Sequence, residues 1–363
     1  MDIYAALLAA VPGLGSRHVR GLIEHFGTAE KAWEASPEAW GAAGLAGEKV
    51  IRQARIFRMH ENEDSYRQKL ADLGAGVCTW RDPLYPALLR ETADPPAVLF
   101  FRGTLERDEK SIAIVGSRKS TPAGLYTAES FGRELAEAGV TVVSGGARGA
   151  DSAAHRGALK GKGRTVAVTA CGPDFTYPPE NKNLFEEICS SGGAVITEFP
   201  PGTPPLKRHF PARNRIIAGM SAGLLVTEAA RRSGTLITAD FALEEGRDVF
   251  AVPGSIWSEM STGTNGLIRN GAFCTVSADS VLEEYGWNSA KKEGKKEKQE
   301  LTLEEEMVYR FCSMDNMTSE EELLEQTRLP IHRLSMILLS LQMKGMLRDM
   351  GTGRFAAVPR NRP

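Results

Sequence analysis

The 363-residue sequence has few of the residues that bind metals or form disulfides. Its five cysteines are scattered, odd in number and without a C-x-x-C pair, which argues against a disulfide framework or a zinc site. The six histidines show no metal-ligand spacing. No apolar run is long enough to span a bilayer, and Asp2 and Pro12 argue against a signal peptide. We therefore expect a cytoplasmic protein without a metal site or membrane contact.

Positive charge is also lacking overall, because the formal net charge is −2. No global basic field attracts nucleic acid, so any such binding must come from a local cluster of basic side chains. The composition is that of an ordinary globular protein, and the length allows two or three domains with buried cores.

The chain divides by composition into four parts. Residues 1–75 have a helical pattern, residues 76–287 alternate short apolar runs with helix-length segments, and residues 301–363 are again helical. Between the last two, residues 288–300 are charged and read as a solvated linker. Because near-continuous apolar runs between helices indicate strands buried on both faces, the middle part is expected to be α/β, with a Rossmann-like, doubly wound, mostly parallel sheet. The expected strands are 98–101, 112–115, 140–143, 165–168, 194–197, 224–226, 249–252 and 273–276.

Ligands of such sheets bind at the carboxyl ends of the strands, so the turns that follow the strands are the candidate sites. The run IAIVGSRKSTPAG (112–124) ends its strand in Gly116, Ser117, Arg118 and Lys119, and SGGARGAD (144–151) carries Arg148. Neither turn completes G-x-G-x-x-G or contains G-K-[ST], so we expect no dinucleotide or NTP cofactor. Each turn instead offers an arginine, whose planar fork suits phosphate oxygens.

A third segment, 198–219, is basic and Pro-rich, and we expect a loop there. It brings together one aromatic and several basic side chains, namely Lys207, Arg208, His209, Phe210, Arg213 and Arg215. Cations pair with phosphates and an aromatic ring stacks on a base, so this combination is typical of single-stranded nucleic acid binding. A duplex reader needs a helix or ribbon for the groove, which a loop does not supply.

Several ordered motifs resemble the DNA-processing protein A (DprA/Smf) family of bacteria. They cover roughly residues 80 to 276, and they are YPALLRETADPPAVLFFRG (85–103), IAIVGSR (112–118), ARGADSAAHRGAL (147–159), YPPEN (177–181), FPARNRIIAG (210–219), EAARRSGTLITA (228–239) and VFAVPG (249–254). Where that family usually has SGLARGID, this chain has Gly146 and Ala150 in place of two apolar residues.

The resemblance implies an extended Rossmann-like domain that binds single-stranded DNA without known catalysis. It also implies a homodimer that helps to load RecA recombinase onto incoming DNA during natural transformation. The binding pocket that it implies consists here of Gly116, Ser117, Arg118, Lys207, Phe210, Arg213 and Asn214, with Arg148 in a flanking motif.

The two flanking parts have motif-like patterns of their own. Residues 11–27 have the shape of a helix-hairpin-helix with Arg17 and Arg20, either a secondary DNA contact or a packing element. Residues 301–363 have the order of a winged helix, whose third helix ordinarily enters the major groove. Residues 301–350, however, hold nine acidic and five basic side chains, which favours protein contact or a structural role over duplex binding.

Other interpretations of single residues stay open. Arg118 pairs with Glu198 or Glu228 if it does not bind DNA. His155 is a general base or, more in keeping with its Ala-rich helix, a structural hydrogen-bonding group. Tyr177 is either packed among its neighbours or free to stack on a base.

Two other functions remain as alternatives. GGARGAD and SGTLITA faintly resemble the lysine-decarboxylase-like (LOG) phosphoribohydrolases, but Thr238 stands where those enzymes need a glutamate. The second alternative is a non-DNA protein adaptor whose basic segment meets an acidic partner.

Overall fold

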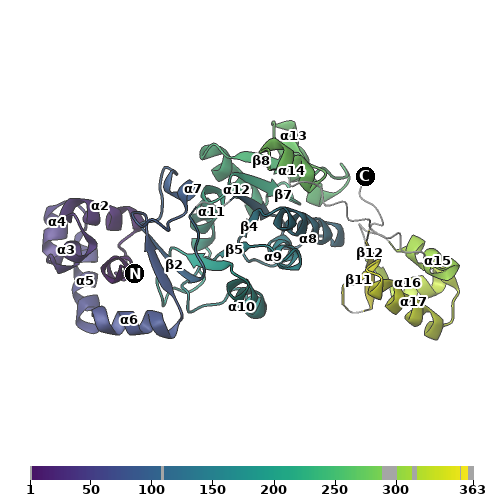
Figure 1. Ribbon diagram of the computed structural model, residues 1–363, viewed down its shortest axis with the longest axis horizontal. Coiled ribbons are helices and arrows are strands. Elements are labelled where there is room, and N and C mark those ends of the chain that lie inside the picture. Colours follow the sequence, from purple (N-terminus) through teal and green to yellow (C-terminus); the bar gives the residue numbers. More distant parts are fainter. Residues whose placement is uncertain (1, 108–109, 288–300, 313–316, 352, 359–363) are drawn as a thin grey trace.

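The computed structural model describes residues 2–107, 110–287, 301–312, 317–351 and 353–358. The chain runs from helices at one end, through a large α/β part, to a small module at the other end (Figure 1). The linker expected at 288–300 lies outside the described residues. No helix in the described ranges has the length and apolarity needed to cross a membrane.

The N-terminal part is helical. Its helices are α1 (Ile3–Ala10), α2 (Ser16–Phe26), α3 (Ala29–Glu34), α4 (Pro37–Ala42), α5 (Glu48–His60) and α6 (Glu63–Asp72). Their core includes the fully buried Trp40, whose Nε1 donates to Ala32 O at 2.8 Å. The same core continues into Val98 and Phe100 of a sheet strand, so these helices are packed on one end of the α/β part.

In the described part of the chain, nine strands form the central sheet in the order β1-β2-β6-β5-β4-β3-β7-β8-β9. They are β1 (Gly76–Thr79), β2 (Val98–Gly103), β3 (Ser111–Val115), β4 (Thr141–Ser144), β5 (Thr165–Val168), β6 (Ala194–Thr197), β7 (Gly223–Val226), β8 (Asp248–Ala251) and β9 (Phe273–Cys274). The seven strands from β6 to β9 are parallel, whereas β2 runs antiparallel to both β1 and β6. This arrangement confirms the expected Rossmann-like sheet and adds β1, which sequence analysis missed.

Helices cover both faces of this sheet, because successive strand residues point to opposite sides. Ile112 and Ile114 of β3 pack with α8 (Pro122–Glu137), α9 (Ala150–Lys160) and α14 (Ala278–Glu284). Ala113 and Val115 pack with α11 (His209–Gly219) and α12 (Gly234–Glu244) on the other face. The remaining helices of the α/β part are α7 (Ala87–Arg90), η1 (Pro179–Asn181), α10 (Lys182–Ser190), η2 (Glu259–Ser261) and α13 (Thr262–Arg269).

Helix α8 begins where its sequence indicates. Thr121 is the N-cap and accepts from Gly124 N, Pro122 is the first helical residue, and Gly139 follows the helix with a φ of +78°. The interpretation of 198–219 as a loop is wrong in its second half, since α11 begins at His209. Pro211 falls in the first turn of α11, where a missing backbone N–H costs no helical hydrogen bond.

The C-terminal module, residues 301–358, has its own core around Val308, Leu334 and Leu341. Its elements are α15 (Leu303–Phe311), β10 (Thr318–Ser319), α16 (Glu320–Thr327), α17 (Ile331–Met343), β11 (Leu347–Asp349) and β12 (Arg354–Ala357). The strands form a small antiparallel sheet in the order β10-β12-β11. Along the chain the elements follow the order helix, strand, helix, helix, strand, strand, which is the element order of a winged helix.

Candidate functional site

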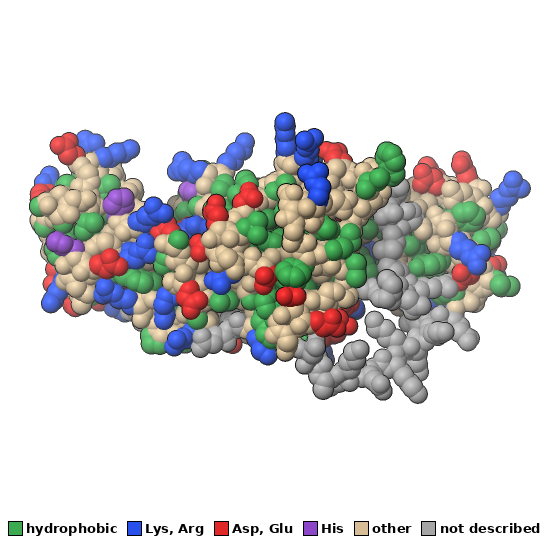
Figure 2. Space-filling view, turned by 90° about the horizontal axis from the view of Figure 1, so that it is seen from above, with side chains coloured by type: hydrophobic (Ala, Val, Ile, Leu, Met, Phe, Trp, Pro, Cys, Tyr) green, Lys and Arg blue, Asp and Glu red, His purple; other side chains and the backbone are tan. Residues whose placement is uncertain are grey.

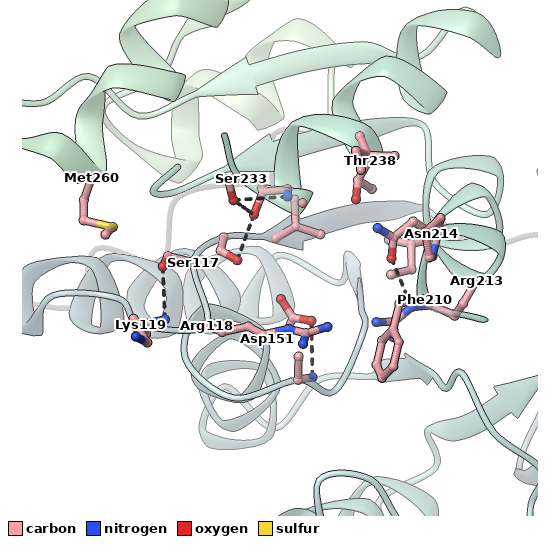
Figure 3. A pocket seen from close by; sticks show the side chains of 18 residues that line it. Ser117, Arg118, Lys119, Asp151, Phe210, Arg213, Asn214, Ser233, Thr238 and Met260 are labelled. Carbon is pink, nitrogen blue, oxygen red and sulfur yellow. Dashed lines mark hydrogen bonds between the residues drawn. The ribbon is translucent and has the colours of Figure 1, made fainter. Parts of the chain in front are cut away.

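The strand order reverses at β3, because β4, β5 and β6 follow on one side of it while β7 lies on the other. In open α/β sheets this switch point is where ligands bind. A cavity of about 490 Å³ lies there, beyond the carboxyl end of β3 (Figure 3). Its walls come from the turn after β3, the start of α9, helix α11 and the N-terminus of α12. We call it the first cavity.

The turn after β3 depends on small residues. A Cβ added to Gly116 meets Ala150 Cβ and Thr227 Oγ1 at 2.6 Å each, so only glycine lets α9 and β7 approach this closely. Ala150 N donates to Ser117 O at 3.2 Å and ties the two segments together. Gly146 has a φ of +62°, a conformation that glycine adopts without strain. Both unusual residues of SGGARGAD therefore serve local packing and backbone geometry.

Arg118 and Phe210 lie on opposite walls of the first cavity. The exposed Arg118 guanidinium lies 4.8 Å from the centroid of the Phe210 ring. Within the described ranges, Arg118 makes no hydrogen bond or ion pair. Glu198 instead binds Arg215, and Glu228 accepts from Thr121 N at 3.0 Å. An arginine held over an aromatic face keeps its donors free for an anion.

The floor of the first cavity is formed by Asp151 and Arg213, which are buried. The Arg213 guanidinium donates to Gly145 O and Val168 O, at the carboxyl ends of β4 and β5. Burial lowers the pKa of Arg213 to about 10, and the neighbouring Asp151 opposes that shift. Burial raises the pKa of Asp151, against the favourable charge of Arg213. Arg213 thus ties strand ends together.

The structure brings some of the expected site residues together and separates others. Those lining the first cavity are Gly116, Ser117, Arg118, Lys119, Phe210, Arg213 and Asn214. Lys207 and Arg208 are exposed just before α11 and do not line the first cavity. Arg215 is bound by Glu198 and by Asp94 O at 2.5 Å. Arg148 forms an ion pair with Glu180 and lies on the far side of the turn after β3.

Sequence analysis missed the N-terminus of α12. Ser233, Gly234 and Thr235 line the first cavity, and Thr235 Oγ1 donates to Gly116 O at 3.0 Å. Unpaired N–H groups at a helix start favour anions. Its sequence signal is the S-G-T at 233–235, which follows the strand 224–226. Thr238 also lines the first cavity, where that enzyme needs a glutamate.

Tyr177 and His155, which lie near the first cavity, are packed against other side chains of the fold. Tyr177 lies edge-on to Phe210 with ring centroids 5.7 Å apart, which fits the packed interpretation. His155 is fully buried, and its Nδ1 lies 2.7 Å from Thr165 Oγ1. Burial lowers the pKa of His155 to about 3. His155 is therefore neutral and outside the lining of the first cavity, which fits the structural interpretation.

The arginines of the N-terminal hairpin are bound within the fold. Arg17 Nε lies 2.9 Å from Asp94 Oδ2, and one Arg20 nitrogen lies 3.1 Å from Asp94 Oδ1. Ser16 Oγ accepts from Ala97 N at 2.7 Å, so the hairpin faces the strand β2. A DNA contact of Arg17 and Arg20 stays a prediction.

Charge on the molecular surface is mixed. On the face shown in Figure 2, Lys and Arg side chains lie among Asp and Glu side chains over most of the molecule. Among the described residues, no group of three or more His, Cys, Asp or Glu side chains is placed to hold a metal ion. The chemistry that the first cavity offers is thus anion binding beside an aromatic ring.

This chain is similar to known proteins over most of its length. Protein Smf of Synechocystis sp. is 39% identical over 281 residues, which cover 76% of this chain and 70% of that protein. The X-ray structure of DNA processing protein A (DprA) from Streptococcus pneumoniae has a TM-score of 0.68 at 35% identity, covering 78% of this chain and 98% of that one.

A second solved structure concerns the single-stranded DNA binding mode of DNA processing protein A from Helicobacter pylori. It has a TM-score of 0.52 at 28% identity, covering 58% of this chain and 95% of that one. The family model of DNA recombination-mediator protein A matches residues 76–286, more than half of the chain. The chain therefore belongs to the DNA recombination-mediator protein A family.

Proposed function

We propose that this chain binds single-stranded DNA through the first cavity, without sequence specificity and without catalysing a reaction. The observation that carries the proposal is Arg118, an exposed arginine placed over Phe210 at the switch point of the sheet. Arg118 and Lys119 supply charge for phosphates, and the Phe210 ring supplies a face on which any base can stack. The Helicobacter pylori relative, whose solved structure concerns its single-stranded DNA binding mode, supports the same chemistry here.

The wider role is also a proposal. Membership of the family supports a cytoplasmic homodimer that takes incoming single strands during natural transformation and loads RecA onto them. The division into parts 1–75, 76–287, 288–300 and 301–363 belongs to this proposal, with the middle part binding DNA. The rate of RecA filament formation on a strand coated with this protein is the measurement that addresses loading.

The DNA proposal is tested by fluorescence anisotropy of labelled single-stranded and duplex oligonucleotides across a salt series. Arg118→Ala is expected to weaken single-strand binding about tenfold or more, because a charge-assisted hydrogen bond contributes ~1.5–3 kcal/mol. It is also expected to flatten the slope of log K against log salt by about 0.7, the value for one phosphate of a single strand.

Phe210→Ala separates stacking from charge. We expect it to cost roughly 1–3 kcal/mol of binding free energy per stacked base while leaving the salt slope unchanged. Arg52→Ala, at an exposed arginine of α5, is the matched control and is expected to change neither quantity. Unchanged binding in both the Arg118 and Phe210 variants would refute the DNA proposal and favour the adaptor alternative.

A further inference from the structure

A second cavity, of about 340 Å³, lies between α8, α9 and the C-terminal module. Among the described residues, four arginines and two glutamates line it, namely Arg118, Arg148, Arg156, Arg348, Glu129 and Glu180. We call it the second cavity. Of its arginines other than Arg118, the sequence predicts only Arg148 as a DNA-binding residue, in a motif flanking the DNA pocket.

Positive charge exceeds negative charge in the second cavity. Arg148 is paired with Glu180, but both side chains are half exposed, so water screens that pair. Glu129 is shared between two cations, Lys160 at 2.5 Å and Arg348 at 2.5 Å. It therefore neutralises neither of them fully. Two carboxylates facing four guanidinium groups leave an environment that favours an anion.

Arg156 adds a cation that the fold leaves free. It projects from α9 as an exposed side chain and forms no hydrogen bond or ion pair within the described ranges. The adjacent His155 is neutral, so it adds no charge on this helix. Polar groups accompany the arginines, since Ser120 and Ser152 also line the second cavity. Guanidinium forks and hydroxyl groups together are donors that suit phosphate oxygens.

The two cavities adjoin at the turn after β3. Arg118 lines both of them, and Gly149 of the second cavity is held against this turn. A Cβ added to Gly149 meets Ser117 O at 2.3 Å, so the Gly149 backbone packs directly on the turn that carries Arg118. A polyanion bound at Arg118 therefore lies beside both cavities.

Arg348 comes from a different part of the chain. It lies on β11 of the C-terminal module, on the side of that module that faces α8 (Figure 1). The module is acidic over residues 301–350, which argues against a duplex footprint of its own. One of its few arginines nevertheless completes a cationic cavity on the α/β part.

We propose that the second cavity binds the phosphodiester backbone of the same single strand that occupies the first cavity, through Arg156 and Arg348. This inference rests on the proposed function, because the strand must first be bound at Arg118. A phosphate there replaces the Glu129 carboxylate as the partner of Arg348. The bound strand therefore joins the C-terminal module to the α/β part.

Oligonucleotide length tests this proposal. An oligothymidylate of about 6 nucleotides is near the lower end of the ~4–16 nucleotides that one OB fold binds, whereas one of about 20 exceeds that range. The double variant Arg156→Ala with Arg348→Ala is expected to bind the short strand normally and the long strand about fivefold more weakly. Its salt slope for the long strand is expected to fall by about 1.4, or about 0.7 per phosphate. Arg310→Ala, a 75% exposed arginine of the same module, is the control and should leave both strands unaffected.

Two further variants make the outcome decisive. Glu129→Gln removes the competing carboxylate, so we expect tighter binding of the long strand, which a purely structural Arg348 does not produce. Full long-strand affinity and slope in the double variant, beside a loss in Arg118→Ala, overturn the second cavity and leave the proposed function standing. If Arg118→Ala is also without effect on either strand, the proposed function fails as well.

Discussion

Two arginines of the first cavity have opposite roles. One is Arg118 at the exposed rim of the cavity, and the other is Arg213 on its buried floor. At the rim, the exposed Arg118 lies over Phe210 with its donors unpaired among the described residues. On the floor, Arg213 is 3% exposed and donates to two strand-end carbonyls beside Asp151. Both guanidinium groups lie within 6 Å of the same ring, Arg118 at 4.8 Å and Arg213 at 5.9 Å. Burial and available partners, more than proximity to the site, decide whether an arginine is left for a ligand.

The largest expected effect is the loss of stability when Arg213 on the floor is replaced. Arg213→Met leaves two buried carbonyls without their donor and Asp151 without its cation, and removing one partner of a buried charged pair costs about 3–5 kcal/mol. We expect a loss of that order in the free energy of unfolding of the α/β part, measured by urea denaturation. Arg118→Met at the rim is the matched control, with an expected change within about 0.5 kcal/mol. Equal losses in the two variants would mean that rim and floor do not differ as described.

The next effect is a pH dependence of the folding stability that comes from the buried His155. Thr165 Oγ1 donates to Val142 O, so it accepts from Nδ1–H of a neutral His155. The folded pKa of His155 is about 3, below its ordinary value of 6.5. Between these values the unfolded chain binds more protons, so stability rises with pH and is lost as pH falls from 6.5 toward 3, by at most about 1.4 kcal/mol per unit.

His155→Asn removes this titration while retaining a group that can donate to Thr165. We expect its urea midpoint to fall less than that of the wild type between pH 7 and pH 5. Parallel curves for the two proteins would show that other groups carry the acid sensitivity.

The rim and the floor of the first cavity differ in how far the sequence predicts them. The rim could be predicted, because a strand, a glycine and an arginine are consecutive between Ile112 and Arg118. The floor could not, since Arg213 meets Gly145 and Val168 only once three distant segments are folded together. For the same reason the basic spacing of residues 207–215 does not reveal that helix α11 directs Arg213 and Arg215 to carbonyl and carboxylate partners. The second cavity could not be predicted from the sequence either, because Arg348 lines it from a distant part of the chain.

The smallest expected effect extends the comparison to the N-terminal hairpin. There Arg17 is 75% exposed like a rim residue, yet it shares Asp94 with Arg20. Asp94→Asn keeps the shape of the side chain and removes its charge, so both arginines lose their ion pair. We expect a stability loss of about 1 kcal/mol, because the Arg17 pair is screened by water and Asp94 and Arg20 remain partly in contact with it. Because Arg20 also donates to Pro95 O and the hairpin faces β2, single-strand affinity should stay unchanged in the anisotropy assay. A gain in affinity with a steeper salt slope would instead identify the hairpin as a DNA contact whose arginines Asp94 neutralises.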